Sequence, residues 1–373
     1  MRITILQGAF LPVPALRGGA VEKMWFALGP EFVARGHEVT HLSRRCDGLP
    51  ARSETAGVRH IRVRGYDRPA RTAAGLVLDY LYARRAAREA PAADVIVTNT
   101  FWAPLLLQPR HGAIYVDVQR MPRGQMKFYR RAARLRANSS AVAQAIVAEA
   151  PRLQARVAMI PNPLPFVPSG PVNWAAKEKL VLFAGRLHPE KGIELLLQAW
   201  TELRAARRLD GWRLELLGPT RGSEGGGGED WADGLRRRFA RDDIAWRAPV
   251  YDAAELNRVY ARAGVFAYPS LAAKGETFGL AILEAMAWGA VPVVSDLACF
   301  RDFVEAGSNG LIFVHDRAQA STALATALEQ AAQPAAQALA RHATRVRESH
   351  SVAAIAGQFI ADFASLTRVG ATR

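Results

Sequence analysis

The chain has 373 residues, half of them hydrophobic and 22% charged. At roughly 100 to 200 residues per domain, this length predicts two domains whose cores are large enough to fold without disulfide bonds. The composition is that of a globular protein rather than of a disordered or fibrous chain. The two cysteines, Cys46 and Cys299, lie far apart and outside any Cys-x-x-Cys or His-rich pattern. They therefore predict neither a disulfide framework nor a zinc site.

Two features of the sequence bear on localisation. No apolar run approaches the roughly 18 residues of a membrane span. The segment 1–8 is broken too early by Gln7 and Gly8 to serve as the apolar core of a signal peptide. Together with the absence of paired cysteines, these observations lead us to expect a cytoplasmic protein.

Charge is distributed unevenly along the chain, whose formal net charge is +15. The first 172 residues carry 25 Lys and Arg against 11 Asp and Glu, whereas the remaining residues carry 24 against 23. A generally Arg-rich composition would raise the charge of both halves. The asymmetry favours an anionic partner for the first half alone, such as a membrane surface or an acidic acceptor.

Short apolar runs alternate with amphipathic stretches in the first half, a pattern typical of parallel sheets with crossover helices. Strands are expected at 2–7, 38–43, 58–63, 94–99, 113–118, 135–139 and 157–160. Helices are expected at 19–35, 72–88 and 123–134, with a further helix ending at 149. The prolines that follow are Pro161, Pro163, Pro165, Pro168 and Pro171. Because proline fixes φ and removes an N–H donor, they predict an irregular linker at 161–176.

The same alternation resumes after the linker. Strands are expected at 179–184, 213–217, 244–247, 265–268, 291–295 and 311–314, and helices at 193–207, 230–241, 253–263, 279–288 and 351–369. The predicted fold class is therefore α/β, with two doubly wound Rossmann-like domains, 1–160 and 177–350, facing across a cleft at the carboxyl ends of their sheets. The helix within 351–373 is expected to pack back on the first domain.

A loop with two cations precedes the predicted helix at 193–207. It contains Gly185-Arg186 and Lys191-Gly192. A helix N-terminus presents free N–H groups and a partial positive charge, so together with a guanidinium and an ammonium group it can bind a diphosphate. Taken alone, one Arg and one Lys are more typical of a solvated loop.

Two carboxylates in the segment 269–289 strengthen the case for a ligand site. Glu276 precedes the predicted helix 279–288, and Glu284 lies inside it among apolar residues, where a buried charge needs a partner. Within a helix, their spacing corresponds to about 12 Å. Paired glycosidase carboxylates are roughly 5 to 9.5 Å apart. We therefore expect the two glutamates to bind different parts of one elongated ligand.

With these motifs the chain resembles the retaining glycosyltransferases of family 4, which have the two-domain GT-B fold. The resemblance covers about residues 180–314 and is weaker before the linker. It rests on Gly185-Arg186, Lys191-Gly192 and the Glu-x7-Glu pair of Glu276 and Glu284, followed by Gly289, Pro292 and Val293.

The resemblance implies a role for each matching residue. Arg186 and Lys191 would hold the diphosphate of a nucleotide-sugar donor that lies beside Gly185. Glu284 would bind the ribose hydroxyls. Glu276 would bind hydroxyls of the donor sugar, helped by the backbone of Thr277, Phe278 and Gly279.

Fewer residues of the first half match the family. Arg17-Gly18-Gly19 resembles its glycine turn, in which absent Cβ atoms let backbone N–H groups approach the donor phosphates. A turn that merely opens a helix is the alternative. The family's usual Asn-Gly-Val-Asp after the linker's Ile-Pro is here Asn162-Pro-Leu-Pro165, a change that we expect to affect the hinge only.

Asp117 stands near the end of the predicted strand 113–118, where members of this family often carry a His. An ionised carboxylate only accepts hydrogen bonds, so Asp117 needs a hydroxyl or a cationic donor. A substrate hydroxyl would make it a catalytic-site residue that faces the cleft. Alternatively, it caps the following loop with Arg120 or Arg123 as its ion-pair partner.

Three other segments receive structural interpretations. Gly225–Gly228 lacks P-loop and Rossmann spacing and is expected to be a mobile loop beside the cleft. His188 is expected to be structural, because the histidines show no metal-ligand spacing. The predicted basic helix 123–134 interleaves Met126, Phe128 and Tyr129 with cations. It either packs its apolar face on the sheet or lies on anionic lipid.

The expected function is retaining transfer of a hexose from a UDP- or GDP-linked donor to a glycan or lipid-linked acceptor in lipopolysaccharide or exopolysaccharide synthesis. No metal and no cofactor are expected, since preorganised cations and a helix dipole would stabilise the leaving diphosphate. The expected partners are the donor, the acceptor and an anionic membrane surface. Two alternatives are a nucleotide-sugar epimerase of the same fold and a basic nucleic-acid-binding protein, for which an aromatic-basic platform is missing.

Overall fold

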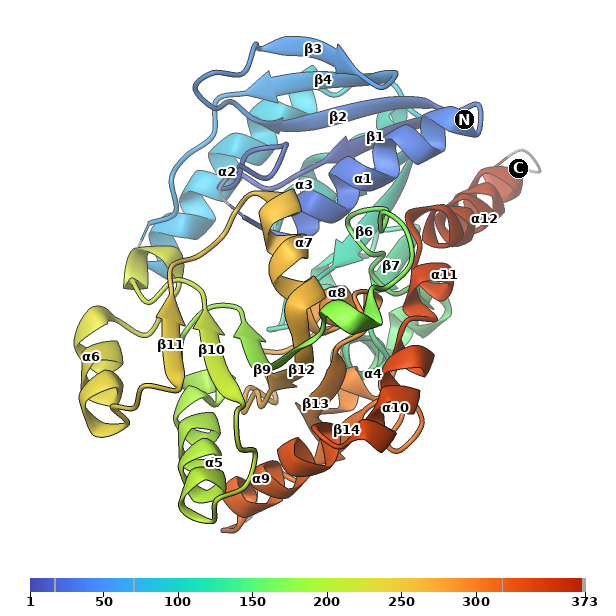
Figure 1. Ribbon diagram of the computed structural model, residues 1–373. Helices are drawn as coiled ribbons and strands as arrows, with labels where there is room; N and C mark the ends of the chain where they lie inside the picture. The colour runs from blue at the N-terminus through green and yellow to red at the C-terminus, as the bar shows by residue number, and fades with distance from the viewer. Residues whose placement is uncertain (17, 70, 317, 371–373) are drawn as a thin grey trace. The chain divides into compact units, whose positions relative to one another are not determined.

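The computed structural model describes residues 1–16, 18–69, 71–316 and 318–370 (Figure 1). The chain divides into two compact units. The N-terminal unit comprises residues 1–167 and 350–373, and the C-terminal unit comprises residues 168–349. The first boundary therefore falls inside the proline-rich segment.

The N-terminal unit is built on an eight-stranded sheet with the order β3-β4-β2-β1-β5-β6-β7-β8, parallel except for the antiparallel pair β3 and β4. The strands are β1 (Arg2–Leu6), β2 (Glu38–Arg44), β3 (Arg52–Thr55), β4 (Val58–Val63), β5 (Val95–Thr98), β6 (Ala113–Val118), β7 (Arg134–Ala137) and β8 (Val157–Met159). The helices are α1 (Ala20–Ala34), α2 (Thr72–Glu89), α3 (Ala103–Leu106), α4 (Ser140–Glu149) and α12 (Val352–Gly370).

The last helix, α12, completes the hydrophobic core of the N-terminal unit. Its Phe359 and Phe363 pack against Trp25 and Phe32 of α1 and against Tyr115 of β6. The Tyr115 hydroxyl also donates a 2.9 Å hydrogen bond to Asp362 of α12. Residues from the two ends of the chain thus share one core.

Two buried histidines pair on neighbouring strands of this sheet. His41 of β2 and His60 of β4 are register partners whose rings stack with centroids 5.6 Å apart. Within the described part of the chain, the two ring nitrogens of His41 and Nδ1 of His60 have no hydrogen-bond partner. Burial, followed by the charges of the neighbouring histidine and Arg62, lowers the pKa of His41 to about 3. Burial and Arg62 lower the pKa of His60 to about 4. Both side chains are therefore held neutral in the fold.

This pair predicts acid lability of the N-terminal unit. In the unfolded chain both histidines take up protons as the pH falls below their ordinary pKa of about 6.5, whereas in the fold they do so only near the lowered values. Stability should therefore decline progressively as the pH falls from about 6.5 towards 4. Urea unfolding of His41→Leu/His60→Leu should show a flatter decline than the parent, with exposed His342→Leu as the control. An equal decline in all three proteins would contradict the assignment.

The C-terminal unit has an entirely parallel six-stranded sheet with the order β11-β10-β9-β12-β13-β14. Its strands are β9 (Glu178–Ala184), β10 (Arg213–Leu217), β11 (Ile244–Arg247), β12 (Ala263–Tyr268), β13 (Val291–Ser295) and β14 (Leu311–Phe313). Its helices are α5 (Ile193–Ala205), α6 (Glu229–Arg238), α7 (Ala253–Arg262), α8 (Leu280–Ala287), α9 (Ala320–Ala331), α10 (Gln337–Ala343) and α11 (Val346–Ser349).

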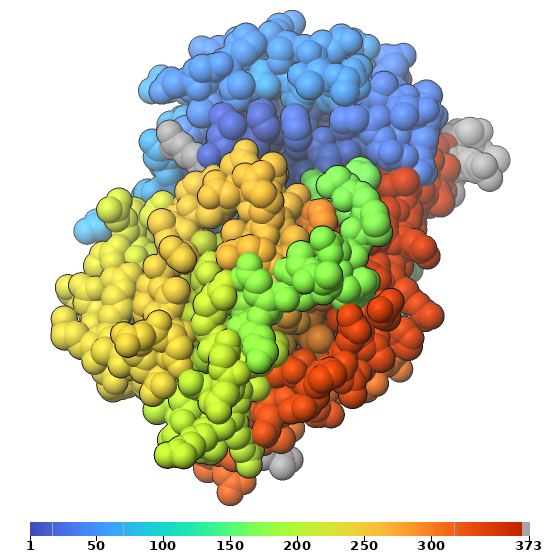
Figure 2. Space-filling model, viewed as in Figure 1, coloured from blue at the N-terminus to red at the C-terminus, as the bar shows by residue number. Residues whose placement is uncertain are grey.

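Residues 168–177 cross the surface of the C-terminal unit beside α10 and α11, as the green and red atoms of Figure 2 show. Lys177 donates hydrogen bonds to the carbonyl oxygens of Ala263 (2.8 Å) and Trp288 (2.6 Å). Arg347 donates to the carbonyl oxygen of Ala287 at 2.6 Å. Two cations therefore hold the C-terminal end of α8, where unpaired carbonyls and the helix dipole favour positive charge.

One expectation about local structure was wrong, and one strand was missed. Residues 123–134 form no α-helix: only Met126–Phe128 make a 3₁₀ turn, with Met126 buried, because the Glu149 carboxylate accepts the N–H groups of Gly124 and Met126. The short strand β3 was not expected. The backbone of Gly225–Gly228 forms hydrogen bonds with neighbouring segments, as described below.

Candidate functional site

The loop that follows β9 leads directly into α5. Gly185 leaves the strand, Pro189–Lys191 form a 3₁₀ turn, and Gly192 caps α5 in the left-handed region with φ 70°. A Cβ atom on Gly192 would overlap the carbonyl oxygen of Pro269, so glycine is required both for the conformation and for the close approach. His188 Nδ1 accepts the N–H of Glu190, which agrees with its expected structural role.

Lys191 and Glu276 form a buried ion pair. Their Nζ and Oε2 atoms are 2.6 Å apart, and the two side chains are only 7% and 10% exposed. The ammonium also lies 5.5 Å from the ring centroid of Tyr268, the last residue of β12. Burial, reinforced by the negative charge of Glu276, raises the pKa of Tyr268 well above its ordinary value. The charge of Lys191 is therefore balanced by Glu276 in the interior of the C-terminal unit.

The side chain of Arg186, in contrast, is 45% exposed. It can therefore contact an anion that arrives from solvent. Its Nη2 donates to Glu190 and its Nη1 to the carbonyl oxygen of Gly225, both at 2.7 Å. Burial raises the pKa of Glu190, but the hydrogen bond and charge of Arg186 outweigh it and leave the pKa below its ordinary value. The guanidinium is thus held at the start of α5.

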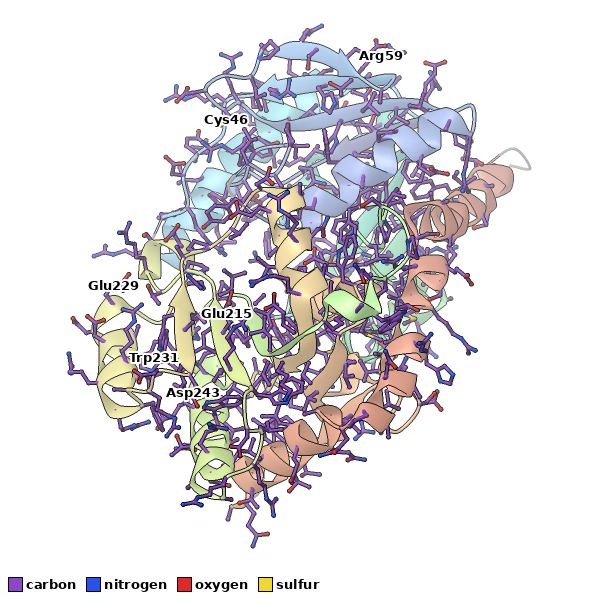
Figure 3. The ribbon with its side chains drawn as sticks, viewed as in Figure 1. Cys46, Arg59, Glu215, Glu229, Trp231 and Asp243 are labelled. Carbon is purple, nitrogen blue, oxygen red and sulfur yellow. The ribbon has the colours of Figure 1, made fainter. Side chains whose placement is uncertain are left out.

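The glycine-rich loop 225–228 is bound to the strand ends around it. The N–H groups of Gly227 and Gly228 donate to the carbonyl oxygens of Leu187 and Thr220, both at 2.8 Å. The loop opens α6, where Glu229 accepts a 2.7 Å hydrogen bond from the Thr220 hydroxyl. Figure 3 shows Glu229 and Trp231 at this end of α6. The loop therefore positions Arg186 and helps to form the site.

The second carboxylate of the pair, Glu284, lies in the interior of α8. It is buried, and the Tyr260 hydroxyl of α7 donates to its Oε2 atom at 2.9 Å. Burial and then the charge of Glu284 raise the pKa of Tyr260 well above its ordinary value. The two glutamates have different partners: Glu276 contacts the cation of the basic loop, and Glu284 accepts a hydrogen bond from Tyr260 of α7.

Residues 277–279 connect the two glutamates. Phe278 is buried against Phe303, with ring centroids 5.0 Å apart, so its side chain serves packing. Gly279 is the N-cap of α8 with φ 89°, and Thr277 is half-buried. Only the backbone of this segment and the Thr277 side chain are therefore candidates for ligand contact.

In the N-terminal unit, Gly18 and Gly19 precede α1 with φ 75° and 110°. A Cβ atom on Gly19 would overlap the carboxylate of Glu22 in the first turn of the helix. Burial raises the pKa of Glu22, and the nearby Arg120 partly offsets this effect. Arg17, the first residue of the proposed turn, lies outside the described residues. The glycine turn therefore includes a buried carboxylate that the sequence analysis did not single out.

Asp117 is a buried ion-pair residue. Its carboxylate lies 2.7 Å from Arg136 Nη1, and both side chains are 0% exposed. The Trp25 indole N–H donates to its other oxygen at 2.7 Å. Neither Arg120 nor Arg123 is the partner that was expected. The burial of Asp117 also contradicts the alternative in which it faces the cleft and a substrate hydroxyl, because the carboxylate is saturated by donors inside the core.

Asn162 belongs to the same network. The expectation that the change at this position affects only the hinge was therefore wrong. Its amide oxygen accepts from Arg136 Nη2 at 2.8 Å, and its amide nitrogen donates to Gln119 at 3.2 Å. Asn138 also donates to Gln119, at 3.1 Å. These polar residues follow β6, β7 and β8, and the only sequence signal for them was their place at strand ends.

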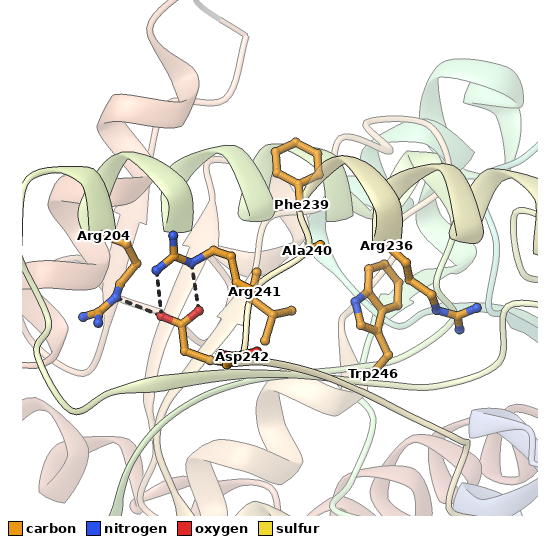
Figure 4. A pocket seen from close by; sticks show the side chains of 9 residues that line it. Arg204, Arg236, Phe239, Ala240, Arg241, Asp242 and Trp246 are labelled. Carbon is orange, nitrogen blue, oxygen red and sulfur yellow. Dashed lines mark hydrogen bonds and ion pairs between the residues drawn. The ribbon is translucent and has the colours of Figure 1, made fainter.

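A separate hollow of about 890 Å³ lies at the amino-terminal edge of the C-terminal sheet (Figure 4). Arg204 and Arg241 both contact Asp243 in it, and Arg236 lies over the Trp246 ring at 5.1 Å. In open parallel sheets, ligands bind at the carboxyl ends of the strands. This hollow is therefore not part of the candidate site.

Within residues 1–16, 18–69, 71–316 and 318–370, no three His, Cys, Asp or Glu side chains are grouped so that they could hold a metal ion. Among the same described residues, no helix is both long and apolar enough to cross a bilayer.

One family model matches the chain within the C-terminal unit. Residues 178–333 match the family model described as glycosyl transferases group 1. A D-inositol 3-phosphate glycosyltransferase from Segniliparus rotundus is 36% identical over 118 residues, which is 32% of this chain and 24% of that protein. The chain thus spans less than half the length of the curated relatives that it matches.

Solved structures resemble the whole chain. Sucrose-phosphate synthase from Thermosynechococcus elongatus covers 99% of this chain and 100% of its own, with a TM-score of 0.76 and 21% identity. HepE from Anabaena, solved with UDP and glucose, covers 98% and 100% with a TM-score of 0.69 and 18% identity. These likenesses confirm the predicted α/β fold class with two Rossmann-like domains. Residues 178–333, less than half of the chain, are thus similar to the group 1 glycosyltransferases, and the fold of the chain is GT-B.

Proposed function

We propose that the protein is a retaining, metal-independent glycosyltransferase that transfers a hexose from a UDP- or GDP-linked donor. The observation that carries this proposal is the arrangement of Arg186 and the Lys191–Glu276 pair at the start of α5, inside the segment that matches the family. A diphosphate there would meet a guanidinium, an ammonium and the N–H groups of a helix terminus. Such preorganised charges stabilise a leaving diphosphate most strongly as its negative charge develops.

The roles of the two glutamates follow from their contacts. A diphosphate that competes for Lys191 would free the Glu276 carboxylate to accept hydroxyl groups of the donor sugar. Glu284, held by Tyr260, would accept ribose hydroxyls. Support for UDP as the nucleotide comes from the UDP-bound structure of the Anabaena neighbour.

We further propose a glycan or lipid-linked acceptor at an anionic membrane surface, as in lipopolysaccharide or exopolysaccharide synthesis. Support comes from the excess of positive charge in the first 172 residues, 25 Lys and Arg against 11 Asp and Glu. The cytoplasmic face of a bilayer attracts such a surface through its anionic lipids.

Thermal stabilisation by a panel of UDP-, GDP- and ADP-sugars tests the donor assignment, because a ligand that binds only the folded state raises the apparent stability. Product analysis with and without acceptor then separates transfer from epimerisation of the donor. Activity should persist in EDTA. Loss of activity in EDTA with recovery by a divalent ion would contradict the metal-independent mechanism.

Substitution of each glutamate should separate the two ends of the donor. Glu284→Gln should weaken UDP or GDP binding about 10- to 100-fold, since a hydrogen bond to a charged group contributes about 1.5–3 kcal/mol. Glu276→Gln should reduce transfer with a smaller effect on free nucleotide affinity. Calorimetry measures both, and Tyr260→Phe serves as a control for disturbance of the α7–α8 interface. Equal losses of nucleotide affinity in the two glutamate variants would contradict the division.

A further inference from the structure

The face of α2 that points away from the N-terminal core is apolar. Leu76, Val77, Tyr80 and Leu81 are 38%, 59%, 37% and 40% exposed. The opposite face, with Asp79, Tyr82, Ala83, Ala86 and Ala87, is buried. A helix that covers a sheet usually places polar residues on its outer face. Four large apolar side chains in two turns therefore indicate that this face meets a partner.

Aromatic contacts extend this surface beyond α2. The Trp102 indole donates to the carbonyl oxygen of Leu76 at 2.9 Å, and its ring packs edge-on against Tyr80 with centroids 5.6 Å apart. Phe101 packs against both Trp102 and Tyr129. Next to Tyr129, Phe128 is 56% exposed. The apolar surface thus continues from α2 to the turn at 126–128.

Cations lie on the same surface. Arg84 and Arg88 follow Val77 and Leu81 at helical spacing, so they project from the same face of α2, and both are exposed. Lys127 lies 5.4 Å from the Phe128 ring centroid. An apolar stripe accompanied by Arg and Lys is typical of helices that lie in the interface of a bilayer.

A small hollow beside this face can accept an anion. It has a volume of about 150 Å³, and Arg84, Arg88 and Arg110 are among its lining residues, together with Gln108. Three guanidinium groups around a hollow match a phosphate in charge and hydrogen-bonding geometry. Apolar side chains next to a phosphate-sized basic hollow match the two parts of a phospholipid.

We propose that the outer face of α2, with Trp102, Phe128 and the arginine-lined hollow, docks the N-terminal unit on an anionic phospholipid surface. A second copy of the chain fits this face less well, because a symmetric contact would bring the rows of Arg84 and Arg88 together. The inference rests on the proposed function only in placing the acceptor at a membrane.

Co-sedimentation of the full-length protein with vesicles tests the proposal. Vesicles of phosphatidylcholine with about a third of anionic phosphatidylglycerol should bind it, whereas pure phosphatidylcholine vesicles should bind it weakly. Val77→Ser/Leu81→Ser should weaken binding about tenfold or more, because the apolar contact is lost. Val167→Ser, at an 84% exposed valine elsewhere in the unit, is the matched control and should bind as the parent does.

The contribution of the α2 arginines to vesicle binding is tested by comparing Arg84→Glu/Arg88→Glu with Arg59→Glu. The guanidinium of Arg59 is exposed on β4 rather than on α2 (Figure 3). The first variant should lose most binding to anionic vesicles, and the second should retain it. UDP binding, which uses the other unit, should be unchanged in every variant, so failure of the donor assignment does not affect this test. Equal binding of parent and Val77→Ser/Leu81→Ser would overturn the proposal. So would concentration-dependent dimerisation that these substitutions abolish, or retention of inorganic phosphate without vesicle binding.

Discussion

Lys191→Ala should both inactivate and destabilise the protein, whereas Arg186→Ala should only lower turnover. Removal of one charge stabiliser from an active site typically costs about 10²–10³ in kcat, so both variants should lose turnover on this scale. Their stabilities should differ because the Lys191–Glu276 pair is buried and the Arg186–Glu190 pair is not. Breaking a buried pair costs about 3–5 kcal/mol, against about 0–1 kcal/mol for an exposed pair.

Urea unfolding and steady-state kinetics of the two variants measure these effects. Lys191→Met/Glu276→Gln is the control for the buried charge, because it removes both ionised groups and should recover much of the stability without restoring turnover. If Lys191→Ala is as stable as the parent, the buried Glu276 carboxylate does not need the Lys191 ammonium as a counterion, which would contradict the prediction. Near-normal kcat in both single variants would contradict the diphosphate assignment.

Local sequence patterns predicted most of the strands in both sheets. Strands at 58–63, 113–118, 213–217, 244–247 and 291–295 have the expected limits, because buried parallel strands read as short apolar runs bounded by polar residues. The strand β3 was missed because its Arg-Ser-Glu-Thr sequence is polar and four residues long. Ala56 and Gly57, both with positive φ, were the available hairpin signal.

The candidate site was predicted in its parts but not in its contacts. The basic loop and the Glu-x7-Glu pair are local motifs, so their residues could be named from the sequence. The pairing of Lys191 with Glu276 spans 85 positions and depends on how β9 and β12 lie in the sheet. The helix expected at 123–134 was wrong for a related reason: Glu149 binds the N–H groups of that segment from 23 and 25 positions away.

Long-range pairing also decides the role of Asp117. Its carboxylate accepts hydrogen bonds from Trp25, Arg136 and Gln119. The guanidinium of Arg136 also lies 5.2 Å from the ring centroid of Phe359 in α12. A fully buried guanidinium needs its counterion because desolvation of a single charge is costly. The network therefore joins α1, β6 and β7 around one ion pair, and α12 covers it.

Asp117→Asn should consequently destabilise the N-terminal unit by about 3–5 kcal/mol, since it keeps the shape of the side chain but leaves Arg136 without a counterion. The folded fraction should retain its kcat, because the carboxylate is not exposed to a substrate. Asp94→Asn is the matched control: Asp94 pairs with Arg2 at an exposed site, where loss of the pair costs about 0–1 kcal/mol. Urea unfolding measures the first effect, and kinetics normalised to the folded fraction measure the second. Full stability with a large loss of kcat/KM would instead place Asp117 in contact with the substrate, which would require the Arg136 pair to open on binding.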